Sequence, residues 1–107
     1  MSAYVSLGRN VTTDDGTGPM SEGDWHAFVG AVRIAVEAWA GPVCSVTFGT
    51  GYYEGKAEET AIIVGETNPR GVDERCLRLT LAALARVYRQ DCIALTVANP
   101  EFIAAQT

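Results

Sequence analysis

The sequence has few of the residues from which metal sites and disulfide frameworks are built. Its 107 residues include one histidine and three cysteines, Cys44, Cys76 and Cys92. The cysteines are far apart and form no CxxC pair, so neither a disulfide framework nor a thiolate zinc site is indicated. A lone histidine also lacks a second histidine with which to hold a metal. We therefore expect no metal, no cofactor and mostly buried, reduced thiols in a cytoplasmic protein.

Basic residues and long apolar runs are scarce as well. Eight Lys and Arg residues stand against 13 Asp and Glu, so the formal net charge is −5. Nucleic acids and anionic membranes are bound largely through clustered basic side chains, so neither is an expected partner of the chain as a whole. The amino terminus shows no basic segment followed by an apolar run, and no later run has the length of a bilayer span. We expect neither export nor membrane insertion.

The remaining composition is that of an ordinary globular domain. Hydrophobic residues make up 48% of the chain and charged residues 20%. At this length one hydrophobic core is expected, so we predict a single domain over residues 1–107. Its first strand covers residues 3–7, with Ala3, Val5 and Leu7 on one face. A polar stretch containing glycine follows, and we expect a loop over residues 10–20.

Two helices are predicted by capping residues and by apolar spacing. Ser21 is a good N-cap for the first helix, and Gly41-Pro42 ends it. The apolar residues between them recur every three or four positions, at Trp25, Phe28, Val29, Val32, Val36 and Trp39. Asp73 caps the second helix, which ends near Gln90. Its predicted buried stripe comprises Leu77, Leu81, Leu84 and Tyr88.

Three further strands complete the predicted fold. They cover about residues 43–48, 58–65 and 92–98, with a glycine-rich hairpin over residues 49–56 and a tail over 99–107. The order βαββαβ predicts an α+β, ferredoxin-like fold, in which a four-stranded antiparallel sheet carries both helices on one face. The other face, which we expect a partner subunit, a ligand or the tail to cover, carries Tyr4, Ser6, Gly8, Ser45, Thr47, Ala94 and Thr96.

Candidate binding residues lie at the ends of the predicted strands. Arg9 and Asn10 follow the first strand directly, where Arg9 can bind an anionic group. The simpler interpretation is a surface Arg paired with one of three carboxylates, Asp14, Asp15 or Glu101. Tyr52 and Tyr53 are consecutive, so a continuing strand would point them to opposite sides. With Tyr4, they are candidates for an interface or a pocket.

Charged residues elsewhere in the chain can be interpreted either as ordinary solvated surface or as functional groups. Four arginines fall on one side of the second helix: Arg75, Arg78, Arg86 and Arg89. A solvated helix face is the simpler interpretation, and a docking surface for an acidic protein or a nucleic acid is the alternative. His26 is expected on the solvated face of the first helix, while Glu58 and Glu59 are expected to be edge charges that discourage aggregation. We identify no catalytic residues.

Several short motifs follow one another in a recognisable order. They are Gly8-Arg9, Trp25 with Phe28, Gly51 with Tyr53, Glu59-Thr60, and Tyr88. This order resembles a family of small bacterial and phage proteins known only as a domain of unknown function, in which a Trp is commoner at the position of Tyr53. The chain also resembles accessory proteins of phages that infect high-GC actinobacteria. That resemblance implies a location in the host cytoplasm and action on a host protein, and it transfers no activity because none is assigned to the family.

Three functions compete at this point. Because no nucleophile, base and orienting residue can be assembled, the first hypothesis is a non-enzymatic binding or interaction module, a homodimer through the open sheet face. The alternative is an enzyme resembling dimeric α/β-barrel proteins and acting on a small organic substrate. A buried pocket between sheet and helices, lined by Tyr4, Tyr53 or Arg9, would favour that alternative. The third is nucleic-acid contact through the arginines of the second helix.

Overall fold

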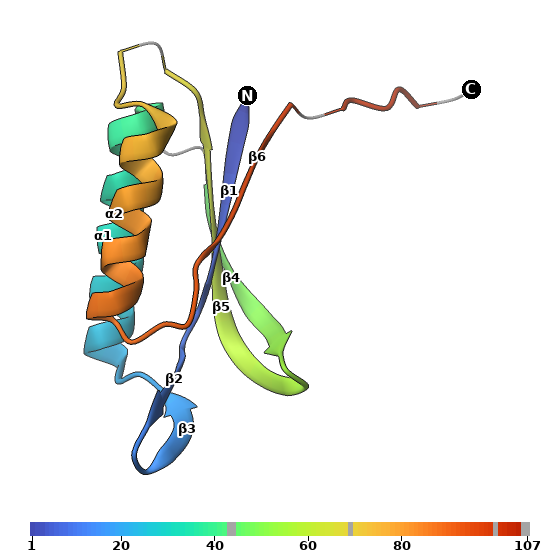
Figure 1. The fold of residues 1–107 in the computed structure, drawn as a ribbon. Helices are drawn as coiled ribbons and strands as arrows, with labels where there is room; N and C mark the ends of the chain where they lie inside the picture. The colour runs from blue at the N-terminus through green and yellow to red at the C-terminus, as the bar shows by residue number, and fades with distance from the viewer. Residues whose placement is uncertain (43–44, 69, 100, 106–107) are drawn as a thin grey trace.

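The computed structural model describes residues 1–42, 45–68, 70–99 and 101–105, except the side chain of Tyr53. These residues form two helices, a four-stranded antiparallel sheet and a separate two-stranded hairpin. The strand order in the larger sheet is β4-β5-β1-β6. Both helices lie side by side against one face of this sheet, and its other face is uncovered (Figure 1). The predicted α+β class, with two helices and a four-stranded antiparallel sheet, is confirmed.

Strand β1 (Ser2–Gly8) lies in the middle of the sheet and divides its side chains between the two faces. It pairs with β5 (Lys56–Glu66) on one side and with β6 (Ala94–Ala98) on the other. Ala3, Val5 and Leu7 are buried against the helices, as the alternation predicted. The edge strand β4 (Ser45–Tyr53) pairs with β5 alone.

Both helices begin at the predicted caps. Helix α1 (Glu22–Ala40) begins after Ser21, whose Oγ accepts a hydrogen bond from the Asp24 N–H at 3.2 Å, and ends at Gly41, where φ is 85°. All six residues of its predicted apolar stripe are buried. Helix α2 (Glu74–Val87) begins after Asp73, whose Oδ1 accepts from the Cys76 N–H at 2.8 Å. Local sequence signals therefore account for both helix starts.

The segment predicted as a loop over residues 10–20 contains strands β2 (Asn10–Thr13) and β3 (Gly16–Pro19), which pair as a hairpin. Its polar composition concealed the strands, although its valine and threonines are β-branched and suit an extended chain. Asp14 and Asp15 make the turn, and Gly16 adopts a φ of 112°. The hydroxyls of Thr12 and Thr17 lie 3.1 Å apart across the pair.

The glycine-rich segment is also more regular than predicted. Strand β4 continues through it to Tyr53, and the turn consists of Glu54 and Gly55 alone, with φ of 52° and 79°. Two consecutive residues with positive φ match the tight turns that join antiparallel strands. The predicted start of this strand, at residues 43–44, lies outside the described residues. The rings of Phe48 and Trp25 meet edge-on with their centroids 6.4 Å apart, but Phe48 is still 55% exposed.

The prediction of mostly buried cysteines is wrong for the two that the structure describes. Cys76 and Cys92 are both exposed, and Cys44 lies outside the described residues. Cys76 is in the first turn of α2, and Cys92 is in the connection that follows this helix. That connection begins earlier than predicted, because Arg89 adopts a φ of 57° and α2 ends at Val87.

The tail does not dock on the described part of the molecule. Phe102 is 89% and Ile103 is 87% exposed, so these residues do not cover the open face of the sheet. Among the described residues, no helix is long and apolar enough to cross a membrane.

Candidate functional site

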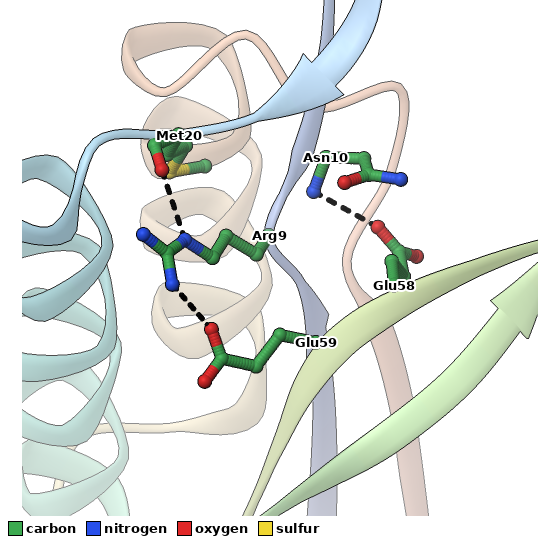
Figure 2. Close-up of polar contacts among 5 residues, drawn as sticks. All are labelled: Arg9, Asn10, Met20, Glu58 and Glu59. Atoms are coloured by element: carbon green, nitrogen blue, oxygen red, sulfur yellow. Dashed lines mark hydrogen bonds and ion pairs between the residues drawn. The ribbon is translucent and has the colours of Figure 1, made fainter.

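Arg9 joins three parts of the chain where β1 ends (Figure 2). Its Nε donates a hydrogen bond to the carbonyl oxygen of Met20 at 2.9 Å, and its Nη1 pairs with the Glu59 carboxylate. The backbone repeats both links, because the Arg9 N–H donates to the Glu59 carbonyl and the Met20 N–H donates to the Arg9 carbonyl. We call this arrangement of Arg9, Met20 and Glu59 the Arg9 clamp. It uses the guanidinium internally, with Glu59 in place of the expected Asp14, Asp15 or Glu101.

Asn10 and Glu58 form a second contact on the uncovered side of the sheet (Figure 2). The Asn10 N–H donates to Glu58 Oε2 at 2.9 Å. The Asn10 carbonyl in turn accepts from Gln90 Nε2 at 3.2 Å, so the connection after α2 is tied to the same point. The Glu58 carboxyl lies over Gly8, where the Cβ of any other residue would overlap it.

Glu58 and Glu59 lie in the part of β5 that pairs with β4 and not with β1, so their position near an edge agrees with the prediction. Their carboxylates are not free surface charges, however. Successive residues of a strand point to opposite faces, which sends Glu59 to the helix side and Glu58 to the uncovered side. Both carboxylates instead connect β5 to the residues that follow β1.

A groove of about 390 Å³ lies on the uncovered side, at the end of the sheet where Gly8 and Glu58 meet. Three segments form it: the end of β1 with the β2–β3 hairpin, the β4–β5 hairpin, and the connection from α2 to β6 (Figure 1). The polar and charged residues that line it are Ser6, Asn10, Thr12, Thr17, Tyr52, Glu54, Lys56, Glu58, Thr60, Arg89, Gln90 and Asp91. We call this feature the open-face groove.

The predicted site residues divide between this groove and other surfaces. Asn10 and Tyr52 line the groove, and Tyr52 is 78% exposed. Tyr4 lies on the uncovered face and is 36% exposed. Arg9 is held in its clamp, with 19% of its side chain exposed. The side chain of Tyr53 lies outside the described part of the structure.

The four arginines of the second helix do not form one continuous row. Arg75, Arg78 and Arg86 are exposed on α2, where Arg78 pairs with Glu74 at 3.1 Å. Arg89 follows the end of the helix and lines the open-face groove. The early end of α2 therefore moves one predicted residue from the helix surface to the candidate site.

Glu58, Thr60 and Asp91 line the groove but were not singled out as binding residues from the sequence. Their shared position depends on the register of β5 against β1, which pairs Thr60 with Gly8. One local signal was present: Gly8 and Gly51 lie where a Cβ would overlap the side chains of Glu58 and Thr60. Glycines on neighbouring strands can mark a close approach, but they do not reveal which side chain approaches.

The start of α2 carries the resolved pKa shifts. Hydrogen bonds from Cys76 lower the pKa of Asp73, because they stabilise its carboxylate form. Asp73 in turn raises the pKa of the Cys76 thiol, first through the hydrogen bond between them and then through the negative charge of Asp73.

His26 is exposed on α1, as predicted. No group of three or more His, Cys, Asp or Glu residues suited to a metal ion occurs in the described ranges.

Comparison with known proteins adds no relatives. No protein-family model matches the chain, and no curated protein or solved structure is significantly similar to it. The family resemblance drawn from Gly8-Arg9, Trp25 and Phe28 stays a prediction.

Proposed function

We propose that this protein is a ferredoxin-like, non-enzymatic binding module that forms a homodimer through the uncovered face of its sheet. The strand order β4-β5-β1-β6 supports the fold assignment, because it places the first and third strands of a βαββαβ chain in the middle of the sheet. The position of both helices on one side supports it as well (Figure 1).

The absence of charge in the middle of the uncovered face carries the proposal of a homodimer. Two rows cross the four strands there: Ser45, Val64, Tyr4 and Thr96, and then Thr47, Ile62, Ser6 and Ala94. None of these eight residues is charged, and charge is depleted at the cores of protein interfaces. Tyr4 is 36% and Ile62 is 41% exposed, so both offer apolar surface.

A second copy of the chain suits this face. A twofold axis brings the same rows of two copies together, and rows without charge do not repel themselves. Sheets that pack face to face lie about 10 Å apart, a spacing that side chains such as Tyr4 and Ile62 can fill from both sides. The small side chains around them, Ser6 and Ala94, leave room for this interdigitation.

The enzyme alternative has less support in the structure. It called for a pocket between sheet and helices lined by Tyr4, Tyr53 or Arg9. Tyr4 instead lies on the face opposite the helices, and the Arg9 guanidinium is occupied by Met20 and Glu59. The open-face groove lies on the uncovered side of the sheet. These positions favour binding over catalysis.

Light scattering after gel filtration tests the proposed homodimer with one substitution and a matched control. Wild type should have twice the chain mass of 11.4 kDa, and Ile62→Glu should be monomeric because it places like charges in the interface. Leu79→Glu adds the same charge on α2 at a side chain that is 61% exposed, and it should remain dimeric. A monomeric wild type, or an Ile62→Glu protein that is still dimeric, would contradict the proposal.

A further inference from the structure

The open-face groove has the size and construction of a small-molecule site. Its volume of about 390 Å³ falls in the range of roughly 300–1,000 Å³ typical of ligand pockets. Its walls come from three segments far apart in the sequence, and the Gln90 hydrogen bond to Asn10 links two of them. The Arg9 clamp ties the residue that follows β1 to Glu59 of β5 and to Met20, which follows β3.

Glu58 is the best-positioned charged group in this groove. The Asn10 N–H fixes its Oε2, and the lack of a side chain at Gly8 lets the carboxyl lie across the strand. The ion pairs of the described residues are Arg9–Glu59, Arg33–Glu37 and Arg78–Glu74, so no described cation pairs with Glu58. Adjacent glutamates thus differ: Glu59 is neutralised by Arg9, whereas Glu58 has capacity to accept a further charged donor.

The other groups that line the groove indicate what kind of ligand would carry a charged donor for Glu58. Three carboxylates line the groove, at Glu54, Glu58 and Asp91, against two cations, at Lys56 and Arg89. With a net charge of −5 on the chain, this balance favours a cationic ligand over an anionic one. The hydroxyls of Thr12, Thr17 and Thr60, which lie outside the two rows of the proposed dimer face, suit a ligand with further polar groups.

We propose that the open-face groove binds a small polar organic molecule bearing a primary ammonium group, and that Glu58 pairs with this group. A charged hydrogen bond between the ammonium and Glu58 would complete the coordination of a carboxylate that Asn10 already orients. The proposal does not rest on the homodimer, since every group that it uses belongs to one chain.

Solution NMR tests this proposal with four probes: ethanolamine, putrescine, spermidine and glucosamine. Each is compared with its fully N-acetylated derivative, in which every amine nitrogen has become an uncharged amide. The Asn10 amide resonance is the main readout, because this N–H donates directly to Glu58. At least one amine should shift the amides of Asn10, Thr60 and Asp91, and its acetylated form should not.

Glu58→Gln provides the decisive variant. Glutamine keeps an oxygen that can accept from the Asn10 N–H, so the local fold is retained while the charge is lost. Loss of a charged hydrogen bond should weaken amine binding by about tenfold or more. Glu22→Gln removes the same charge from an exposed position on α1 and should bind like wild type.

Three results would overturn the proposal: no amine of the panel shifts the groove amides, the acetylated forms bind equally well, or Glu58→Gln binds as tightly as Glu22→Gln. None of these readouts depends on the oligomeric state. Failure of the amine site and failure of the homodimer are therefore distinguishable.

Discussion

Strand β5 passes through two different environments: one part is packed beneath the helices, and the other part borders the candidate site. Its residues 60–64 pair with both β4 and β1, and Ala61 and Ile63 are fully buried beneath the helices. Residues 56–59 pair with β4 alone, in a hairpin arm over residues 50–59 in which Tyr52 is 78% exposed. The covered sheet is held by packing, whereas the arm is held by its turn, its strand pairing and its polar links to Arg9 and Asn10.

The comparison also shows why the candidate site lies where it does. The arm and the β2–β3 hairpin both extend away from the helices (Figure 1), and both contribute residues that line the open-face groove. Arg9 and Asn10 stand at the boundary between the two regions. There the buried strand β1 ends, and residues that line the open-face groove begin.

The largest expected effect separates the two regions by stability. Phe28 is fully buried under the covered sheet and stacks on Tyr88 with ring centroids 4.8 Å apart. Phe28→Ala should lower the free energy of unfolding by about 3–5 kcal/mol, because it leaves a cavity in the core. Tyr52→Ala in the arm should change it by no more than about 0.5 kcal/mol. Urea denaturation measures both, and similar losses would show that the arm belongs to the same packed core.

The covered region could largely be predicted from the sequence because its signals are local. Ser21 and Asp73 cap helices within three residues of themselves, and the apolar spacing of α1 identifies its buried face without knowledge of any partner. The β2–β3 hairpin was missed because a polar strand that packs on little leaves no hydrophobic alternation.

The candidate site required information that is not local. Arg9 pairs with Glu59 across 50 residues of sequence, and Asn10 meets Glu58 across 48. The sequence singled out Arg9 and Asn10 by their place after a strand, but their partners follow only from the register of β5 against β1. Without that register, Glu58 and Glu59 looked like ordinary surface charges.

Substitutions at two glycines should have effects of intermediate size on stability, and they should differ in their effect on amine binding. A Cβ at Gly71 would overlap the backbone carbonyl of Trp39, which the end of α1 holds in place, so Gly71→Ala should cost about 1–3 kcal/mol of stability. A Cβ at Gly8 would overlap the Glu58 carboxyl, which can swing away with the loss of one hydrogen bond. Gly8→Ala should therefore cost only about 1 kcal/mol while weakening amine binding.

Denaturation and NMR titration of both glycine variants check this prediction. The expected pattern is a larger stability loss with binding retained for Gly71→Ala, and a smaller stability loss with weakened binding for Gly8→Ala. A Gly8→Ala protein that binds amines like wild type would show that the position of Glu58 over the strand is unimportant.

The smallest expected effect is the pH dependence of stability that arises from Asp73, the N-cap of α2. The pKa of Asp73 is lowered from 3.8 by hydrogen bonds from Cys76, so its carboxylate stabilises the fold above that pH. This contribution is lost as the pH falls below 3.8 through the lower pKa of the folded protein. Asp73→Asn keeps a capping oxygen but does not titrate at this position. The melting temperature of wild type should therefore fall slightly more than that of the variant between about pH 7 and pH 2.5.

The reactivity of Cys76 provides a second test of the negative charge on Asp73. Its thiol pKa is raised because Asp73 accepts its hydrogen bond and repels the thiolate, so removing the charge should increase the thiolate fraction. Alkylation of Cys76 at about pH 8 should be faster in Asp73→Asn than in wild type, while alkylation of the exposed Cys92, far along the chain, should be unchanged. Equal rates at Cys76 would mean that Asp73 caps α2 through its backbone contact alone and that its charge does not act on the thiol.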